Sequence, residues 1–190
     1  MLRSLPTLLA LLWLAPAALA AQEPAPAGAR PAAFCFRPRP GDRCRAFLVT
    51  ELSRGAREFG PYRGLEDKFQ WDWGAMVNVG ERQAVGATYV FGEPKNGHRG
   101  VSLRYRRWLG SGIALDVAPG AIVVGNDYDG RRVRLTAHTA VTLGDVLGVF
   151  THGESSRDGG QLGTGAKLVS WPGLVAGLAL YSLIAIVPET

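Results

Sequence analysis

The stretch Phe69-Gln-Trp-Asp-Trp-Gly-Ala-Met-Val-Asn-Val79 decides the fold class, because its large apolar side chains recur at every second residue. Its odd-numbered positions hold Phe, Trp, Trp, Ala, Val and Val, and its even-numbered positions hold Gln, Asp, Gly, Met and Asn. A helix would scatter these two sets around its circumference, whereas a strand places them on opposite faces. The stretch therefore predicts a β-strand with one apolar face.

The same alternation recurs along most of the chain. Clear examples cover residues 84–91, 101–106, 113–123 and 132–143, and weaker ones cover 44–52, 145–152 and 161–170. Tight turns at 80–82, 110–111 and 143–145 alternate with longer polar links at 93–99, 125–131 and 153–160. Short and long connections in alternation predict an antiparallel up-and-down sheet, with the short turns at one end and the long loops at the other.

Two closed architectures fit such a sheet of about eight strands: a soluble barrel with an apolar interior, and a membrane barrel with an apolar exterior. The less apolar face of these strands is rich in Gly and Ala and carries isolated charges, so it suits a narrow lumen better than a surface in water. Strands of about 9–11 residues also have the length that crosses a bilayer when tilted. We predict an all-β, up-and-down antiparallel transmembrane β-barrel over residues 44–170.

The barrel prediction assigns each strand side chain to the lumen or to lipid. The polar side chains expected in the lumen are Asp72, Arg104, Arg106, Asp116, Arg132, Arg134, His138 and Lys167. The aromatic side chains expected to face lipid are Phe69, Trp71, Trp73, Tyr89, Phe91 and Tyr105. An eight-stranded barrel is just wide enough for its own side chains, so this lumen is expected to be plugged.

The start of the chain has the features of a cleaved signal peptide over residues 1–20. A positively charged start precedes an apolar run at 8–14 and a small-residue cleavage site at 18–20. Residues 21–43 then form a Pro/Ala-rich tether and a short loop that ends at the second cysteine. In the oxidising compartment that export implies, Cys35 and Cys44 are expected to form a disulfide, with two free thiols as the alternative.

The C-terminal tail, residues 171–190, is a short hydrophobic segment. The chain is uncharged from Leu168 to Pro188, and Trp171-Pro-Gly173 marks a break after the last barrel strand. We expect residues 174–187 to form a short apolar helix at the membrane interface or beside the barrel. A ninth strand and a spanning helix are the alternatives, although a helix of 14 residues would be about 21 Å long against a hydrocarbon core of ~30 Å.

The signal peptide, the alternation and the turn lengths together resemble those of the small eight-stranded outer-membrane β-barrel proteins of Gram-negative bacteria, the class that includes the OmpA transmembrane domain and OmpX. The resemblance covers residues 44–170. It implies that both termini and the short turns lie in the periplasm and that the longer loops lie outside. The chain departs from the family at its end, Val187-Pro-Glu-Thr190, where members finish the last strand with an aromatic residue.

We therefore expect an outer-membrane protein with a structural or surface-interaction role that is neither a general porin nor an enzyme. Its expected partner is outer-membrane lipid. The basic residues behind the net charge of +5 are scattered, and the run at 104–108 alternates as a strand does, so nucleic acid is not expected. A soluble periplasmic barrel that binds a small apolar ligand is the main alternative.

The chemistry-bearing residues point to no cofactor and no metal site. His98 is expected to be a solvated loop residue and His138 a hydrogen-bonded lumen residue. The pair His152 and Ser155 supports the alternative of a lipid-modifying enzyme, because some barrels that resemble this one use a Ser/His pair near the outer leaflet. The acidic stretch at 126–129 is expected to be an Asx-rich turn rather than a weak Ca²⁺ site.

Overall fold

The computed structural model describes residues 30–59, 69–92, 98–110, 112–124, 132–156 and 159–186. The predicted signal peptide, most of the tether and the polar links at 93–97 and 125–131 lie outside these residues. The described residues from Pro31 onward belong to one compact unit. They form a closed β-barrel followed by one helix.

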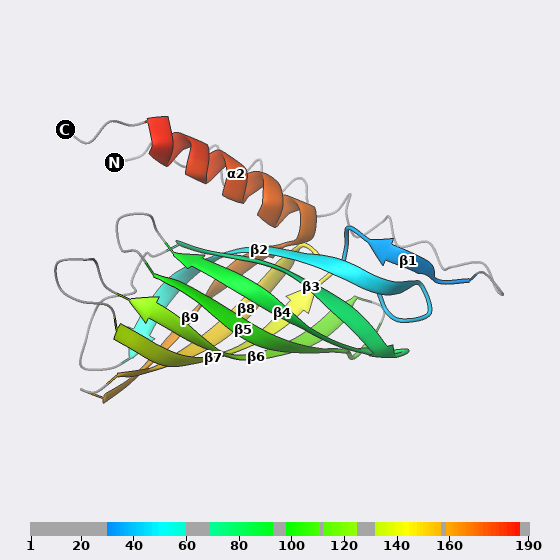
Figure 1. Cartoon of the computed structure of the whole chain (residues 1–190), viewed down its shortest axis with the longest axis horizontal. Helices are drawn as coiled ribbons and strands as arrows, with labels where there is room; N and C mark the ends of the chain where they lie inside the picture. The colour runs from blue at the N-terminus through cyan, green and yellow to red at the C-terminus, as the bar shows by residue number, and fades with distance from the viewer. Residues whose placement is uncertain are drawn as a thin grey trace. The chain divides into compact units, whose positions relative to one another are not determined.

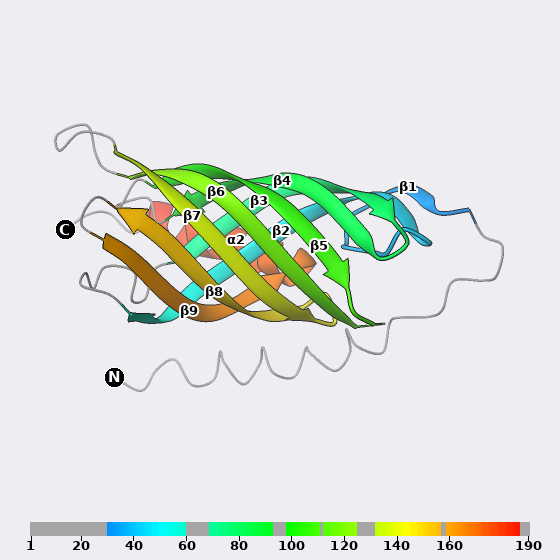
Figure 2. The ribbon, with the colours of Figure 1, turned by 90° about the horizontal axis from the view of Figure 1, so that it is seen from below.

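Eight strands form the barrel (Figures 1 and 2). They are β2 (Cys44–Phe59), β3 (Phe69–Gly80), β4 (Gln83–Gly92), β5 (Arg99–Trp108), β6 (Ile113–Val124), β7 (Arg132–Leu143), β8 (Leu147–Ser156) and β9 (Gly159–Val169). Each strand pairs antiparallel with the next along the chain, and β2 pairs with β9 to close the sheet. The prediction of an all-β, up-and-down barrel of eight strands is confirmed.

The strand β5 shows how the sequence pattern specifies the barrel. Burial alternates without a break along this strand, so that Arg104 and Arg106 are buried while Leu103 and Tyr105 are exposed. The short turns fix the register in which neighbouring strands pair. In the turn between β7 and β8, Gly144 and Asp145 have φ angles of 62° and 58°, the conformation whose twist matches that of paired strands.

The prediction of a polar link over residues 153–160 is wrong. β8 continues to Ser156 and β9 begins at Gly159, and the two strands pair in register up to these residues. This part of the chain lacks apolar side chains and so resembles a loop in sequence. The ladder forms because backbone groups pair whatever side chains they carry.

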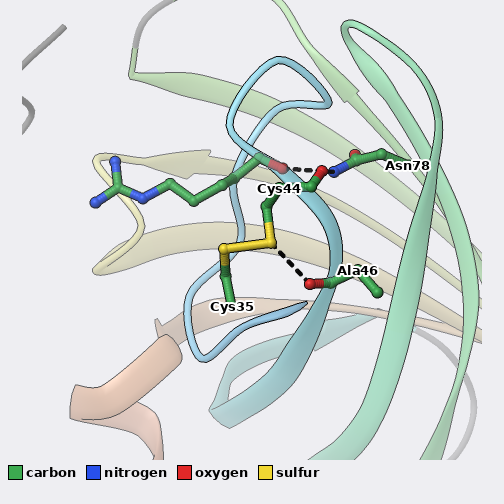
Figure 3. The surroundings of a disulfide bond; sticks show 5 residues. Cys35, Cys44, Ala46 and Asn78 are labelled. Carbon is green, nitrogen blue, oxygen red and sulfur yellow. Dashed lines mark hydrogen bonds between the residues drawn. A yellow bond between two sulfur atoms is a disulfide. The ribbon is translucent and has the colours of Figure 1, made fainter. Parts of the chain in front are cut away.

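A short additional strand, β1 (Ala32–Cys35), pairs parallel with the start of β2. β1 pairs with β2 before Glu51, and the pairing of β2 with β9 begins at Glu51. The predicted Cys35–Cys44 disulfide is confirmed and closes the loop between the two strands (Figure 3). The amide of Asn78 donates hydrogen bonds to the carbonyls of Arg39 and Cys44, at 2.9 and 2.6 Å. The loop is therefore fixed to the short-turn end of the barrel.

The C-terminal tail is a helix rather than a ninth strand. α2 (Ser170–Ile186) has 17 residues without a charge, which gives a length of about 25 Å. Within the described part of the chain, no helix has both the length and the apolar character needed to cross a membrane. A helix that is apolar on all sides is unsuited to a surface in water.

α2 packs against the outer wall of the barrel over β2 and β9 (Figure 1). Ser170, with a φ of 64°, turns the chain out of β9, and its carbonyl accepts a hydrogen bond of 2.7 Å from Thr50 Oγ1. Glycines then bring the helix close to the sheet, because a Cβ at Gly177 would lie 2.7 Å from the Trp71 indole. The helix therefore covers Trp71, which points outward but is only 8% exposed.

This contact predicts the effect of enlarging Gly177. The substitution Gly177→Val places side-chain atoms where the Trp71 ring lies, so it is expected to displace α2 and to cost about 1–3 kcal/mol of unfolding free energy. Urea unfolding in detergent, followed by tryptophan fluorescence, measures this. The control Ala179→Val adds a side chain at an exposed position of the same helix and is expected to leave stability unchanged. Equal stability of the two variants would contradict the packing described.

Candidate functional site

Six charged side chains meet inside the barrel, and we call them the ionic core. Its members are Glu51, Asp72, Arg104, Arg106, Asp116 and Lys167. They come from β2, β3, β5, β6 and β9, and all are buried. The three carboxylates balance the three cations, so the group is neutral when all six are ionised.

Glu51 is the centre of the ionic core. Its Oε2 lies 2.6 Å from Arg104 Nη1 and 2.8 Å from Lys167 Nζ. Its Oε1 lies 3.2 Å from Arg106 Nη2. A single carboxylate therefore contacts all three cations.

The two aspartates complete the charge pairing. Arg106 and Asp116 are register partners on β5 and β6 and form a two-pronged contact, with Nε–Oδ1 at 2.6 Å and Nη2–Oδ2 at 2.7 Å. Arg104 Nη2 donates to Asp72 at 2.8 Å, and Gln70 donates to the other oxygen of that carboxylate at 2.9 Å. A forked arginine–carboxylate pair such as that of Arg106 and Asp116 is both strong and geometrically specific.

An apolar layer fills the lumen on the short-turn side of the ionic core. It consists of Phe47, Val49, Met76, Ala84, Trp108 and Ala114. Phe47 and Trp108 pack edge to face, with ring centroids 5.7 Å apart, and the Arg106 guanidinium lies 5.9 Å from the Phe47 ring centroid. Trp108 therefore points into the lumen.

A polar layer fills the lumen on the long-loop side. Its buried members are Thr88, Ser102, Thr136, His138 and Glu154. Arg134 forms a salt bridge with Glu154, whose other oxygen lies 4.0 Å from His152 Nε2. The His138 ring stacks on Phe150 at a centroid distance of 4.9 Å. The hydrogen bond predicted for His138 is not seen at Nε2, which has no partner among the described residues.

The structure brings most of the predicted lumen residues together. Five of them belong to the ionic core, and Arg134 and His138 lie in the polar layer. The side chain of Arg132 lies outside the described part. Glu51 and Glu154 were not among the predicted lumen residues, and they supply carboxylates that the predicted lumen lacked. The charge balance of the predicted set could have indicated further carboxylates in the lumen, since that set held five Lys and Arg residues against two aspartates.

The predicted lipid-facing aromatic residues occupy outward positions, but they differ in exposure. Tyr89 and Tyr105 are exposed, while Phe69, Trp73 and Phe91 are half-buried. The prediction is wrong for Trp71, because α2 covers its ring.

The solvated environment predicted for His98 is wrong as well. His98 is 6% exposed, and its ring lies over the Cα of Gly92. The backbone N–H of Gly92 donates a hydrogen bond of 2.9 Å to the His98 carbonyl. His98, immediately before β5, therefore lies against Gly92 at the end of β4.

The structure separates the two residues of the predicted Ser/His pair, His152 and Ser155. The register of β8 puts His152 on the lumen side and Ser155 on the outer side, so the two do not form a nucleophile–base pair. In the described ranges, no three His, Cys, Asp or Glu residues are grouped so as to hold a metal ion. The acidic stretch at 126–129 lies outside those ranges.

Comparisons with known proteins add only a distant likeness. No protein-family model matches the chain, and no curated protein matches it. A solved structure of a de novo designed transmembrane β-barrel is similar over 70% of this chain and 98% of that chain. The identity is 11% and the TM-score is 0.38. The function therefore has to be inferred from the residues of this chain.

The ionic core predicts a large effect of neutralising its central carboxylate. Glu51→Gln keeps the shape of the side chain but leaves three buried cations with two carboxylates. Removal of one partner from a buried ion pair costs about 3–5 kcal/mol. Urea unfolding of the refolded protein in detergent is expected to show a loss of this size. The control Glu81→Gln, at an exposed turn, is expected to have no effect, and equal midpoints would contradict the role of Glu51.

Proposed function

We propose that this protein is an integral outer-membrane β-barrel with a closed lumen and a structural or surface-interaction role. The observation that carries the proposal is the inverted distribution of side chains. Charged groups are buried inside the barrel, while large apolar side chains are exposed on its outer face. This is the arrangement of membrane barrels and the reverse of that in soluble ones.

The exposed apolar surface is extensive. Leu103, Val133 and Leu135 are 69%, 71% and 66% exposed, and other large apolar side chains are exposed on β3, β4, β6, β8 and β9. Soluble monomers rarely expose contiguous apolar patches larger than a few hundred Å². The uncharged helix α2 extends this surface, with Trp171, Val175 and Leu178 exposed along one side. Hydrocarbon is the environment in which such a surface is stable.

Three further observations support the outer membrane and the resemblance to small eight-stranded barrels. The disulfide between Cys35 and Cys44 is typical of proteins that fold in an oxidising compartment. The sequence at 1–20 has the pattern of a cleaved export signal. The barrel strands have 10 to 16 residues, enough to cross a bilayer when tilted.

A closed lumen argues against a porin role. The ionic core links β2, β5, β6 and β9 across the interior, and the apolar layer lies directly on its short-turn side. Single-channel recordings in planar bilayers are therefore expected to show negligible conductance. Steady channels of porin size would contradict the closed lumen, whether or not the protein inserts.

A charge on the outer face tests the membrane environment directly. Leu103 lies in the middle of β5, and an arginine on the lipid face near the bilayer midplane costs about 2–4 kcal/mol. Leu103→Arg is therefore expected to weaken folding into vesicles by that amount. Leu109→Arg places the same charge at an exposed position after the end of the strand, where the cost is expected to be under about 1 kcal/mol.

Heat-dependent gel migration of the protein refolded in detergent gives the readout. The folded barrel is expected to migrate differently before and after boiling. A protein that stays folded and soluble without detergent, and tolerates Leu103→Arg, would contradict the proposal. Such a result would favour a soluble barrel that binds an apolar ligand.

A further inference from the structure

The loop at residues 36–43, between β1 and β2, forms a basic surface at the short-turn end of the barrel. It carries Arg37, Arg39 and Arg43 against a single acid, Asp42. Within the described part of the chain, none of these three guanidinium groups forms an ion pair. Three positive charges therefore lie close together at this end without a fixed counter-charge.

The loop is held rigidly. The disulfide closes it, and Asn78 donates hydrogen bonds to the carbonyl of Arg39 within it and to that of Cys44 at its end. The N–H of Gly41 donates to the Glu81 carbonyl at 2.9 Å, and Pro38 is fully buried. The backbone that carries the arginines is thus held in place at the short-turn end of the barrel.

Two carboxyl groups lie near the cluster: Asp42 in the loop itself and Asp145 in the turn between β7 and β8. Burial raises the pKa of Asp145, although Arg106, Arg39, Arg37 and Arg43 all act to lower it. These two acids are fewer than the three arginines of the loop. The surface keeps a net positive charge at neutral pH.

An exposed aromatic pair lies immediately before the arginines. Phe34 and Phe36 are 48% and 79% exposed and pack edge to face, with ring centroids 5.8 Å apart. Phe34 is a register partner of Ala46, which in turn pairs with the exposed Val77 on β3. The apolar outer band of the barrel therefore continues onto β1 and ends where the arginines begin.

We propose that this collar, defined as Phe34, Phe36, Arg37, Arg39 and Arg43, binds the headgroups of anionic phospholipids. The proposal rests on the membrane location proposed above and adds the lipid class and its site. Arginine forks match phosphate oxygens, and aromatic side chains favour the boundary between hydrocarbon and headgroups. The exposed phenylalanines favour lipid over an acidic protein or nucleic acid, because they continue an apolar surface that faces hydrocarbon.

Lipid binding to the full chain folded in detergent tests this proposal. Native mass spectrometry is used to titrate the folded protein with phosphatidylglycerol or with phosphatidylcholine of the same acyl chains. Phosphatidylglycerol is expected to bind roughly tenfold more tightly, since each basic residue near an anionic surface contributes an appreciable attraction. Added salt is expected to reduce the difference.

Matched variants locate the site. Arg37→Gln/Arg43→Gln is expected to abolish the preference for phosphatidylglycerol. Arg54→Gln/Arg99→Gln removes the same charge from two exposed arginines at the long-loop end and is expected to retain it. Equal affinity for both lipids, or equal losses in both variants, would overturn the lipid site while leaving the membrane barrel intact. Failure to obtain a heat-modifiable folded form in detergent would overturn the membrane barrel and the lipid site together.

Discussion

The buried carboxylate of Glu51 is the constraint on which the rest of the barrel depends. It lies within 2.6–3.2 Å of three cations that come from β5 and β9. Without it, those cations would be buried charges short of a counter-ion, which is a costly state. β2 and β5 are not neighbours in the sheet, so the contacts join walls of the barrel that no backbone hydrogen bond connects.

A charged interior goes together with an apolar outer surface of the barrel. Because side chains alternate along a strand, filling the lumen with charged and small residues leaves the outward positions to Val, Leu, Ile and the aromatic residues. The outer surface then needs hydrocarbon or a protein cover. α2 supplies a cover over β2 and Trp71, and β1 extends the outer band, while its disulfide loop is hydrogen-bonded to the short-turn end. α2 and β1 thus pack on the outside of a barrel that β2–β9 already close.

The alternation of side chains and the lengths of the connections were enough to predict the barrel, its strand order and most of its lumen residues, because both are local properties of the chain. It failed where pairing depends on backbone alone, as at residues 153–160, and where an outward residue meets another part of the chain, as Trp71 meets Gly177. Glu51 was missed because its strand has a weak pattern and apolar inward neighbours, Phe47 and Val49. Its role emerges only when β5 and β9 are brought around it. The burial of His98 over Gly92 likewise depends on the pairing of two residues that lie beyond the alternating stretches, which no periodicity encodes.

The most direct test of the inverted barrel compares two native tryptophans that the structure places on opposite sides of the wall. Trp73 lies at an outward position on β3, whereas Trp108 packs against Phe47 inside the lumen. Variants that keep only one of these tryptophans would be folded into vesicles containing phospholipids with brominated acyl chains, which quench fluorescence on contact. Strong quenching of Trp73 and little quenching of Trp108 are expected. Quenching of Trp108 alone, or of neither residue in a folded barrel, would contradict the inverted barrel.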